Sequence, residues 1–142
     1  MIKLKGRTVN PGRTAGKAVV TKIPFSFLGE LDPMSGKYLG ADQELRGQSL
    51  AGKVLICPTG KGSTGGPSVA FRAMETGVAP KAIICLEAEP VIALSAITAE
   101  IPMVDRLDMN PLELIDTGDY VCVDATEGLV EITKETVEKA NG

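Results

Sequence analysis

The alternation of hydrophobic and polar positions predicts a β-rich chain at its N-terminal end. Residues 2–9 alternate weakly, residues 10–12 (Asn-Pro-Gly) carry a turn signal, and apolar positions resume over residues 15–23, so we expect two paired strands. Residues 24–48 then contain many turn formers and few apolar positions, which predicts a long irregular connection. Long loops inside compact domains more often serve function than merely connect elements.

From Lys53 onward, short apolar runs alternate with helical patterns. Pro67 and Pro90 suit the first turns of helices, and Gly77 suits a C-terminal cap. The charged tail, 134–142, is expected to fray. The predicted strands are 54–57, 82–86, 102–104, 120–123 and 129–132, and the predicted helices are 67–76, 90–99 and a single turn at 111–115. These elements predict one α/β domain over residues 1–142, with a β-rich shell around two central helices.

Composition narrows the class of protein. The 142 residues are enough for one core, and 44% hydrophobic with 23% charged residues is an ordinary globular balance. The net charge of −3 and the scattered Lys and Arg residues argue against a nucleic-acid partner. No apolar run approaches the roughly 18 residues that span a bilayer, and the N-terminus lacks the apolar region of a signal peptide. We therefore expect a cytoplasmic protein with no membrane partner.

Cysteine and histidine usage restricts the available chemistry. Cys57, Cys85 and Cys122 lie in the apolar runs VLIC, AIIC and YVCVD, without metal-type spacing, which favours buried free thiols in strands over metal ligands. The sequence contains no histidine. Ser-His-Asp and Cys-His catalysis and most transition-metal sites are thereby excluded, so any proton transfer must use another residue.

The most informative segment is the glycine-rich loop PTGKGSTGGP, residues 58–67. It follows an apolar strand and precedes a helix, so its backbone N–H groups and the helix dipole favour an anion such as a carboxylate or phosphate. The glycines allow a ligand to approach the backbone closely, Lys61 adds a charge, and Ser63 and Thr64 add hydroxyls. The candidate substrate-binding residues in this loop are Lys61, Gly62, Thr64, Gly65 and Gly66.

Two nucleotide-binding motifs compete for the same loop. A P-loop requires Gly-Lys-Ser or Gly-Lys-Thr, whereas this loop has Lys61 between two glycines, so that motif fails. Gly60, Gly62 and Gly65 do match the G-x-G-x-x-G dinucleotide fingerprint, and Glu87 follows at a suitable distance. That motif is weak alone, and about fifty residues of β-rich chain precede it. A non-catalytic dinucleotide-binding module remains an alternative.

Three motifs together resemble the small subunit of the aconitase X family. They are GKGSTGG after VLICPT, the upstream LDPMSG, and the N-terminal GRTVNPGRTAGKAVVT, and the resemblance extends over residues 6–132. It implies a swivelling β/β/α domain similar to the C-terminal domain of aconitase. It also implies a hydro-lyase that is active only with a large partner subunit. That subunit would carry an iron–sulfur cluster, expected to be 4Fe–4S, while this chain would bind no cofactor or metal.

The resemblance also assigns a mechanism and a substrate class. Family members remove water from a hydroxy acid, the cluster acting as Lewis acid, and Ser63 would take the proton. Because a serine hydroxyl is only weakly acidic, its alkoxide requires stabilisation by loop amides and a cation. Lys61 and one arginine are the candidate cations, with Arg13, Arg46, Arg72 and Arg106 all open. The substrate is expected to be a phosphorylated or carboxylated hydroxy acid: mevalonate 5-phosphate in isoprenoid synthesis, or hydroxyproline as the alternative.

Asp32 lies before a proline in the long connection. Two roles are open for this residue: an Asx-type turn, or substrate binding together with the glycine-rich loop.

Overall fold

The computed structural model describes residues 1–135 and contains one eight-stranded sheet with four helices. The strands are β1 (Ile2–Lys5), β2 (Arg7–Asn10), β3 (Arg13–Val20), β4 (Val54–Cys57), β5 (Ala82–Cys85), β6 (Met103–Asp105), β7 (Tyr120–Asp124) and β8 (Leu129–Thr133). The helices are α1 (Phe27–Glu30), α2 (Gly66–Thr76), α3 (Pro90–Thr98) and α4 (Pro111–Leu114). Predicted boundaries from Lys53 onward differ from these by at most one residue.

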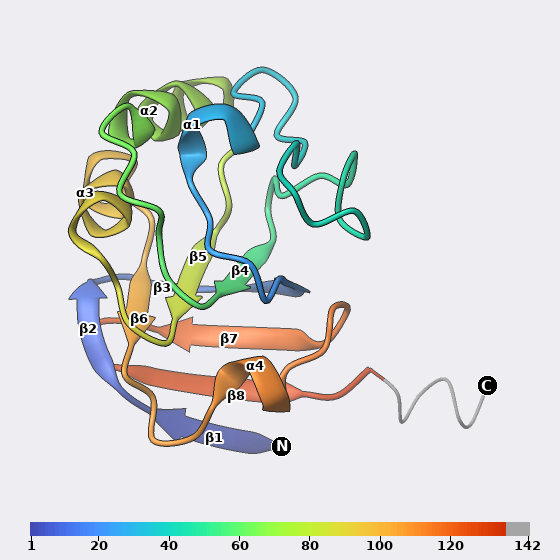
Figure 1. Cartoon of the computed structure of the whole chain (residues 1–142). Helices are drawn as coiled ribbons and strands as arrows, with labels where there is room; N and C mark the ends of the chain where they lie inside the picture. The colour runs from blue at the N-terminus through green and yellow to red at the C-terminus, as the bar shows by residue number, and fades with distance from the viewer. Residues whose placement is uncertain (136–142) are drawn as a thin grey trace.

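The sheet folds over itself into two layers. Its order is β1-β8-β7-β3-β4-β5-β6-β2, and β3 belongs to both layers. Arg13–Lys17 pairs with β7 in the antiparallel layer, while Ala18–Val20 pairs with β4 in the layer that contains the parallel strands β4, β5 and β6. Figure 1 shows β7, β8 and β1 below these parallel strands, with α2 and α3 above them.

Two hydrophobic cores separate the three layers. All four residues of β4 are buried, and they alternate between the cores because successive side chains of a strand point to opposite faces. Leu55 and Cys57 face the core beneath α2 and α3, whereas Val54 and Ile56 face the core above β7 and β8. The continuous apolar run that predicted a buried strand therefore reflects burial on both faces.

The predicted α/β fold with a β/β/α arrangement is confirmed. The two main helices are central in the chain, with β-structure on both sides in sequence, and in space they cover one outer face of the sheet. The long connection is also irregular as expected, since α1 is its only helix.

The expected pairing between the first strands is wrong. β1 pairs with β8 and β2 pairs with β6, so neither pairs with β3. The chain passes from one layer to the other at Gly6, whose N–H donates to the Gly128 carbonyl at 2.8 Å. A side chain at Gly6 would overlap the Asp105 carbonyl oxygen, so the bend requires glycine. Contacts distant in sequence, rather than the local turn at 10–12, decide the pairing.

The expectation that all three cysteines are buried is wrong for Cys122. Cys57 and Cys85 are fully buried on neighbouring strands, with their Sγ atoms 3.5 Å apart. Cys122 is exposed because Val121 and Val123 point into the core, which leaves the residue between them on the outer face of β7.

The start of the expected frayed tail is anchored. The Lys134 ammonium donates to the Leu114 carbonyl at 2.8 Å and pairs with Asp119, and the Glu135 N–H donates to Asp119 at 3.0 Å. The remainder of the tail, 136–142, lies outside the described residues.

Candidate functional site

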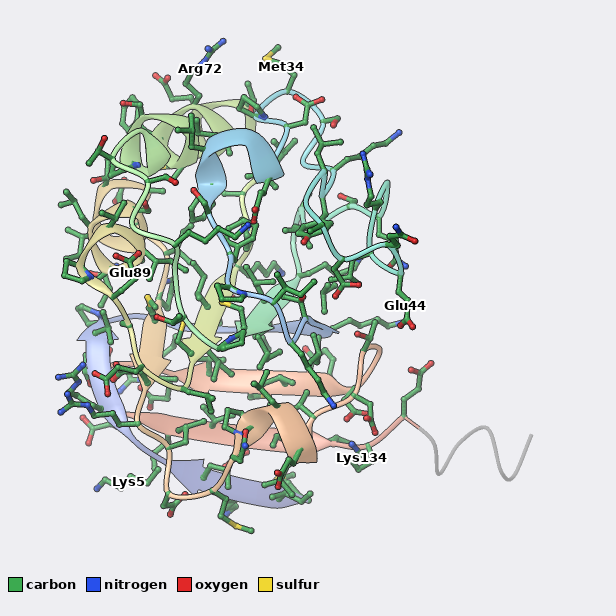
Figure 2. All side chains as sticks on the ribbon, in the orientation of Figure 1. Lys5, Met34, Glu44, Arg72, Glu89 and Lys134 are labelled. Atoms are coloured by element: carbon green, nitrogen blue, oxygen red, sulfur yellow. The ribbon has the colours of Figure 1, made fainter. Side chains whose placement is uncertain are left out.

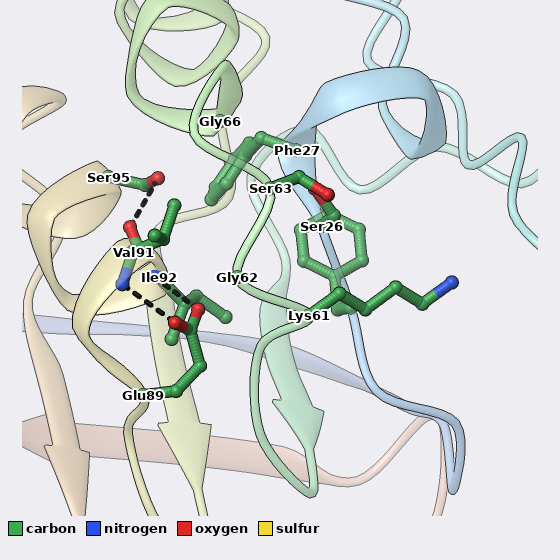
Figure 3. A pocket seen from close by; sticks show the side chains of 11 residues that line it. Ser26, Phe27, Lys61, Gly62, Ser63, Gly66, Glu89, Val91, Ile92 and Ser95 are labelled. Atoms are coloured by element: carbon green, nitrogen blue, oxygen red, sulfur yellow. Dashed lines mark hydrogen bonds between the residues drawn. The ribbon is translucent and has the colours of Figure 1, made fainter.

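The glycine-rich loop forms one wall of a pocket at the start of α2. The Phe25 N–H donates to the Thr59 carbonyl at 3.0 Å, and Phe25 pairs with Gly60 in a parallel bridge, so residues 25–30 run beside the loop. The first turns of α3 form the opposite wall (Figure 3). The lining residues are Phe25, Ser26, Phe27, Lys61, Gly62, Ser63, Gly66, Glu89, Val91, Ile92 and Ser95.

The N-terminus of α2 has the features of an anion site. Gly65 is its N-cap residue, Pro67 lies in its first turn, and no side chain caps it. The Gly66 N–H donates to the Ser63 carbonyl at 3.0 Å, which folds the loop back over the helix start. Because Pro67 has no N–H and the Gly66 N–H is already engaged, the positive end of the helix dipole, rather than a full set of free amides, is what favours an anion there.

Ser63 is half-buried and lines this pocket, as do Gly62 and Gly66. Two other predicted residues are adjacent in sequence but do not line it. Thr64 is exposed, and Gly65 packs against Leu28, whose side chain would lie within 3.0 Å of a Cβ at that position. The structure thus brings together Ser63, Lys61, Gly62 and Gly66.

Lys61 is engaged by a carboxylate that the sequence analysis did not single out. Its ammonium pairs with Glu30, a nearly buried residue that also accepts the Ser26 N–H at 3.0 Å. Figure 3 shows the Lys61 side chain running away from the α3 side of the pocket. In this structure its charge is therefore neutralised by Glu30 rather than directed at Ser63.

Asp32 lies apart from the pocket and forms an Asx-type turn. Its carboxylate accepts the Met34 N–H and the Ser35 hydroxyl, both at 2.9 Å, and these bonds hold the pKa of Asp32 below its ordinary value. The Thr76 hydroxyl donates to the Pro33 carbonyl, so the turn sits at the C-terminal end of α2, opposite the glycine-rich loop.

The four candidate arginines are absent from the residues that line the pocket. Arg13 pairs with Asp124 at 3.0 Å, and Arg106 pairs with Glu87 at 2.8 Å. Arg46 is exposed in the long connection, and Figure 2 shows Arg72 projecting outward from α2. Among the described residues, this chain places no arginine beside Ser63.

Two pocket residues, Ser26 and Glu89, and the neighbouring Glu30 were not assigned to the site from the sequence, although local signals marked them as helix caps. Ser26 caps α1 and Glu30 reaches back to its N–H, which is the logic of a capping box with one extra residue. Glu89 directly precedes Pro90 and caps α3. No local signal in the sequence indicates that the α1 cap and the α3 cap face the same loop.

An ion pair between the exposed Arg7 and a buried carboxylate fixes the chain just before Glu89. Asp105 is fully buried and accepts two bonds from the Arg7 guanidinium, at 2.9 and 2.7 Å. The same carboxylate accepts the Ala88 N–H at 2.8 Å. Breaking such a pair leaves an uncompensated buried charge, so this anchor holds the residues that lead into α3.

The described residues contain no cluster-binding set. Within residues 1–135, no three Cys, Asp or Glu side chains gather as a group that could hold a metal ion. Cys57 and Cys85 are enclosed in the core, and Cys122 lies on the outer face of the other layer. Among residues 1–135, the side chains present therefore do not fit an iron–sulfur cluster.

Comparison with known proteins identifies the family. The model of the aconitase X swivel domain matches residues 3–132. This chain belongs to the aconitase X swivel domain family. The resemblance found in the sequence motifs is thereby confirmed, and the pocket described above belongs to a swivel domain.

Relatives of this swivel domain are similar over nearly their whole length. The phosphomevalonate dehydratase small subunit of Methanosarcina acetivorans is 46% identical over 133 residues, covering 94% of this chain and 92% of the relative. The protein of the same name from Thermococcus onnurineus is 49% identical over 131 residues, covering 92% and 98%.

A solved structure has the same fold. It is a crystal structure of Thermococcus kodakaraensis aconitase X in its holo-form, to which this chain is 46% identical. The superposition has a TM-score of 0.87 and covers 94% of this chain and all of that chain.

The helices of the described residues are too short or too polar to cross a membrane. The cytoplasmic location expected from the sequence stays a prediction.

Proposed function

We propose that this swivel domain is the small subunit of a phosphomevalonate dehydratase, a hydro-lyase that converts mevalonate 5-phosphate to its anhydro product in isoprenoid synthesis. The observation that carries the proposal is the near-complete coverage of relatives bearing that name at 46–49% identity. The pocket supports it, because an uncapped helix N-terminus beside a glycine-rich loop suits a phosphate or carboxylate.

Within this proposal Ser63 abstracts the substrate proton. It is the hydroxyl of the glycine-rich loop that lines the pocket, and its carbonyl accepts the Gly66 N–H, which orients the residue at the positive end of α2. That positive potential favours an alkoxide over a hydroxyl. Because Glu30 neutralises Lys61 and the arginines lie elsewhere, we propose that any further cation beside Ser63 comes from the partner.

A large partner subunit would complete the site. In this structure the pocket leaves no room for a water-sized molecule, whereas typical ligand sites enclose ~300–1,000 Å³. The outer face of α3 beside it is apolar: Leu94 and Ile97 are 52% and 51% exposed, and no charged residue occurs between Glu89 and Glu100. We propose that the large subunit covers this face and supplies the iron–sulfur cluster.

Reconstitution tests the proposal. The chain is co-expressed with its large subunit, and each subunit is also prepared alone with anaerobic iron–sulfur reconstitution. We expect water loss from mevalonate 5-phosphate only with both subunits together, and stoichiometric iron only in preparations that contain the large subunit. Turnover of hydroxyproline in its place would establish the alternative substrate. A stoichiometric cluster on this chain alone would overturn the division of labour.

The dinucleotide-binding alternative requires a separate assay. Equilibrium binding of a labelled dinucleotide to the isolated chain distinguishes it from the dehydratase, because the proposed subunit is expected to bind none.

A further inference from the structure

Of the two longer helices that begin at the pocket, α2 and α3, only α2 has an N-terminus free of side-chain caps. The Glu89 carboxylate accepts the Val91 N–H at 2.8 Å and the Ile92 N–H at 2.7 Å, so both of its oxygens are held by the first turn of α3. No side chain does this for α2. Figure 3 shows the Glu89 carboxylate beneath α3, with Gly62 of the loop between it and Lys61.

The glycine-rich loop is shaped around this carboxylate. A Cβ at Gly60 would overlap the Glu89 Oε1 atom and would lie 2.8 Å from the Ile92 Cβ, so the backbone of the loop fits only because residue 60 has no side chain. Glu89 is also fixed from behind, since Asp105 holds the N–H of the preceding Ala88 at 2.8 Å. The carboxylate is thus held from two sides, and it lines the pocket together with Ser63.

An ordinary helix cap explains part of this arrangement. Ser, Thr, Asp and Asn are the usual N-cap residues, and each would satisfy the α3 amides with a shorter side chain. Compared with the uncharged caps Ser, Thr and Asn, a glutamate adds a negative charge to the wall of a pocket that otherwise suits an anion. That charge repels a second anion from the α3 side and leaves the α2 side available.

We propose that Glu89 is a specificity-determining residue that closes the N-terminus of α3 to anionic ligand groups and directs them to α2. This rests on the proposed function, in which the substrate carries both a phosphate and a carboxylate. Two equivalent anion sites in one pocket would accept such a molecule in two orientations. With Glu89 in place only one orientation is bound by this chain, and the other anionic group is left to the partner subunit.

Steady-state kinetics of the two-subunit enzyme provide the first test. Glu89→Ser keeps a good N-cap and removes the carboxylate, so the substrate gains a second, unproductive orientation. Unproductive binding lowers kcat and KM by the same factor, which we expect to be about three- to tenfold from the strength of helix N-termini toward anions. Glu87→Ser is the matched control, because it removes a carboxylate two residues away that is exposed and paired with Arg106. We expect it to leave both constants near those of the wild type.

Binding of inorganic phosphate to the isolated chain provides the second test. In backbone amide NMR spectra, we expect phosphate to shift the first turn of α2 in the wild type, and to shift Val91 and Ile92 as well in Glu89→Ser. Glu89→Gln controls for a loss of fold, because its side-chain amide oxygen can still cap α3. In this variant we expect phosphate to shift the same amides, by a smaller amount.

The outcomes separate this proposal from the proposed function. New shifts at Val91 and Ile92 in the variants support the role of Glu89 even if the complex does not dehydrate mevalonate 5-phosphate. A Glu89→Ser enzyme whose kcat falls with KM unchanged, or whose constants match the wild type, would overturn it. So would phosphate spectra in which Glu89→Ser and the wild type respond alike.

Discussion

At the scale of single residues, carboxylates determine how this domain holds its loops. Glu30 holds Lys61 and the Ser26 amide, Glu89 holds the start of α3, and Asp105 holds Arg7 and the Ala88 amide. Asp119 does the same at the far end of the molecule, where it accepts the Asp116 and Glu135 N–H groups and pairs with Lys134. Each carboxylate joins segments that are distant in sequence or irregular in structure. We therefore expect the loss of one carboxylate to displace the loop that it holds rather than to disrupt the hydrophobic core.

The environment of Asp119 predicts that part of the unfolding free energy depends on pH in the acid range. Burial raises its pKa, but the Lys134 ammonium and the backbone N–H groups of Asp116 and Glu135 outweigh burial and lower the pKa below 3.8. A carboxylate with a depressed folded pKa stabilises the fold above its unfolded pKa, and this contribution is lost as the pH falls through the folded value. We therefore expect the unfolding free energy to fall below about pH 4.

The variant Asp119→Ala isolates this contribution. It should lower the unfolding free energy at neutral pH by about 1.5–3 kcal/mol, the value of hydrogen bonds to a charged group, and should weaken the acid dependence in urea titrations. Asp124→Ala is the control, since that carboxylate pairs with an exposed arginine and should cost less than about 1 kcal/mol. An equal loss of unfolding free energy in the two variants would contradict the larger contribution assigned to Asp119.

At the scale of elements, the glycine-rich loop depends on Gly60 more than on Gly65. Gly60→Ala places a methyl group against Glu89 and Ile92 and should cost about 1–3 kcal/mol, as overpacking does. Gly65→Ala is the matched control, because its methyl group meets only the half-exposed Leu28 side chain, which can move. Thermal unfolding of the two variants measures the difference. A Gly65→Ala variant that is less stable than Gly60→Ala would contradict the packing described here.

The outer face of α3 gives a second prediction at this scale. Ile97→Lys should leave the isolated chain within about 0.5 kcal/mol of the wild type, because the side chain is exposed. It should weaken assembly with the large subunit about tenfold or more if this face is buried there. Leu129→Lys on the outer face of β8 is the control and should assemble normally. Titration calorimetry measures the affinity of each variant for the large subunit. An equal change in affinity for both variants would contradict the placement of the interface on α3.

The elements that local signals define were predicted well. The apolar run VLIC, the glycines after it and Pro67 together specify β4, the loop and α2, because each signal acts within a few residues. The partners of β1 and β2 were not predictable in this way, since they depend on strands about a hundred residues away. Cys122 shows a different error: the alternation in YVCVD was available, but its apolar composition was given more weight.

The site was predicted in part for the same reason. The loop sequence alone predicted an anion site with the hydroxyls of Ser63 and Thr64, and the resemblance to the aconitase X family singled out Ser63 as the base. Glu30 and Glu89 lie 33 residues before and 26 residues after Ser63 in sequence, and only the fold brings Glu89 into the pocket and Glu30 to the Lys61 side chain that lines it. Two roles were open for Asp32: its carboxylate forms the Asx-type turn, and its part in substrate binding stays a prediction.

At the scale of the whole molecule, the two layers of the sheet have different roles. The antiparallel layer of β1, β8 and β7 closes the lower core, and the parallel strands carry on their carboxyl ends the loops that build the pocket. Open α/β sheets bind ligands at this edge. The pocket is shallow and its charges are largely paired within the chain, so the domain is suited to present a base and an anion site to a partner rather than to enclose a substrate alone.

The measurement that tests this account most directly is the turnover of mevalonate 5-phosphate by the two-subunit enzyme carrying Ser63→Ala. The fold, the assembly and the substrate affinity should stay close to those of the wild type, because one hydroxyl in the loop contributes little to stability. Turnover should fall about 10²–10⁴-fold, the value of a positioned acid–base residue. Thr64→Ala is the control, since that hydroxyl is exposed outside the pocket and should have a small effect. A Ser63→Ala enzyme that keeps more than about a tenth of the wild-type kcat, or a larger loss in Thr64→Ala, would contradict the assignment of the base.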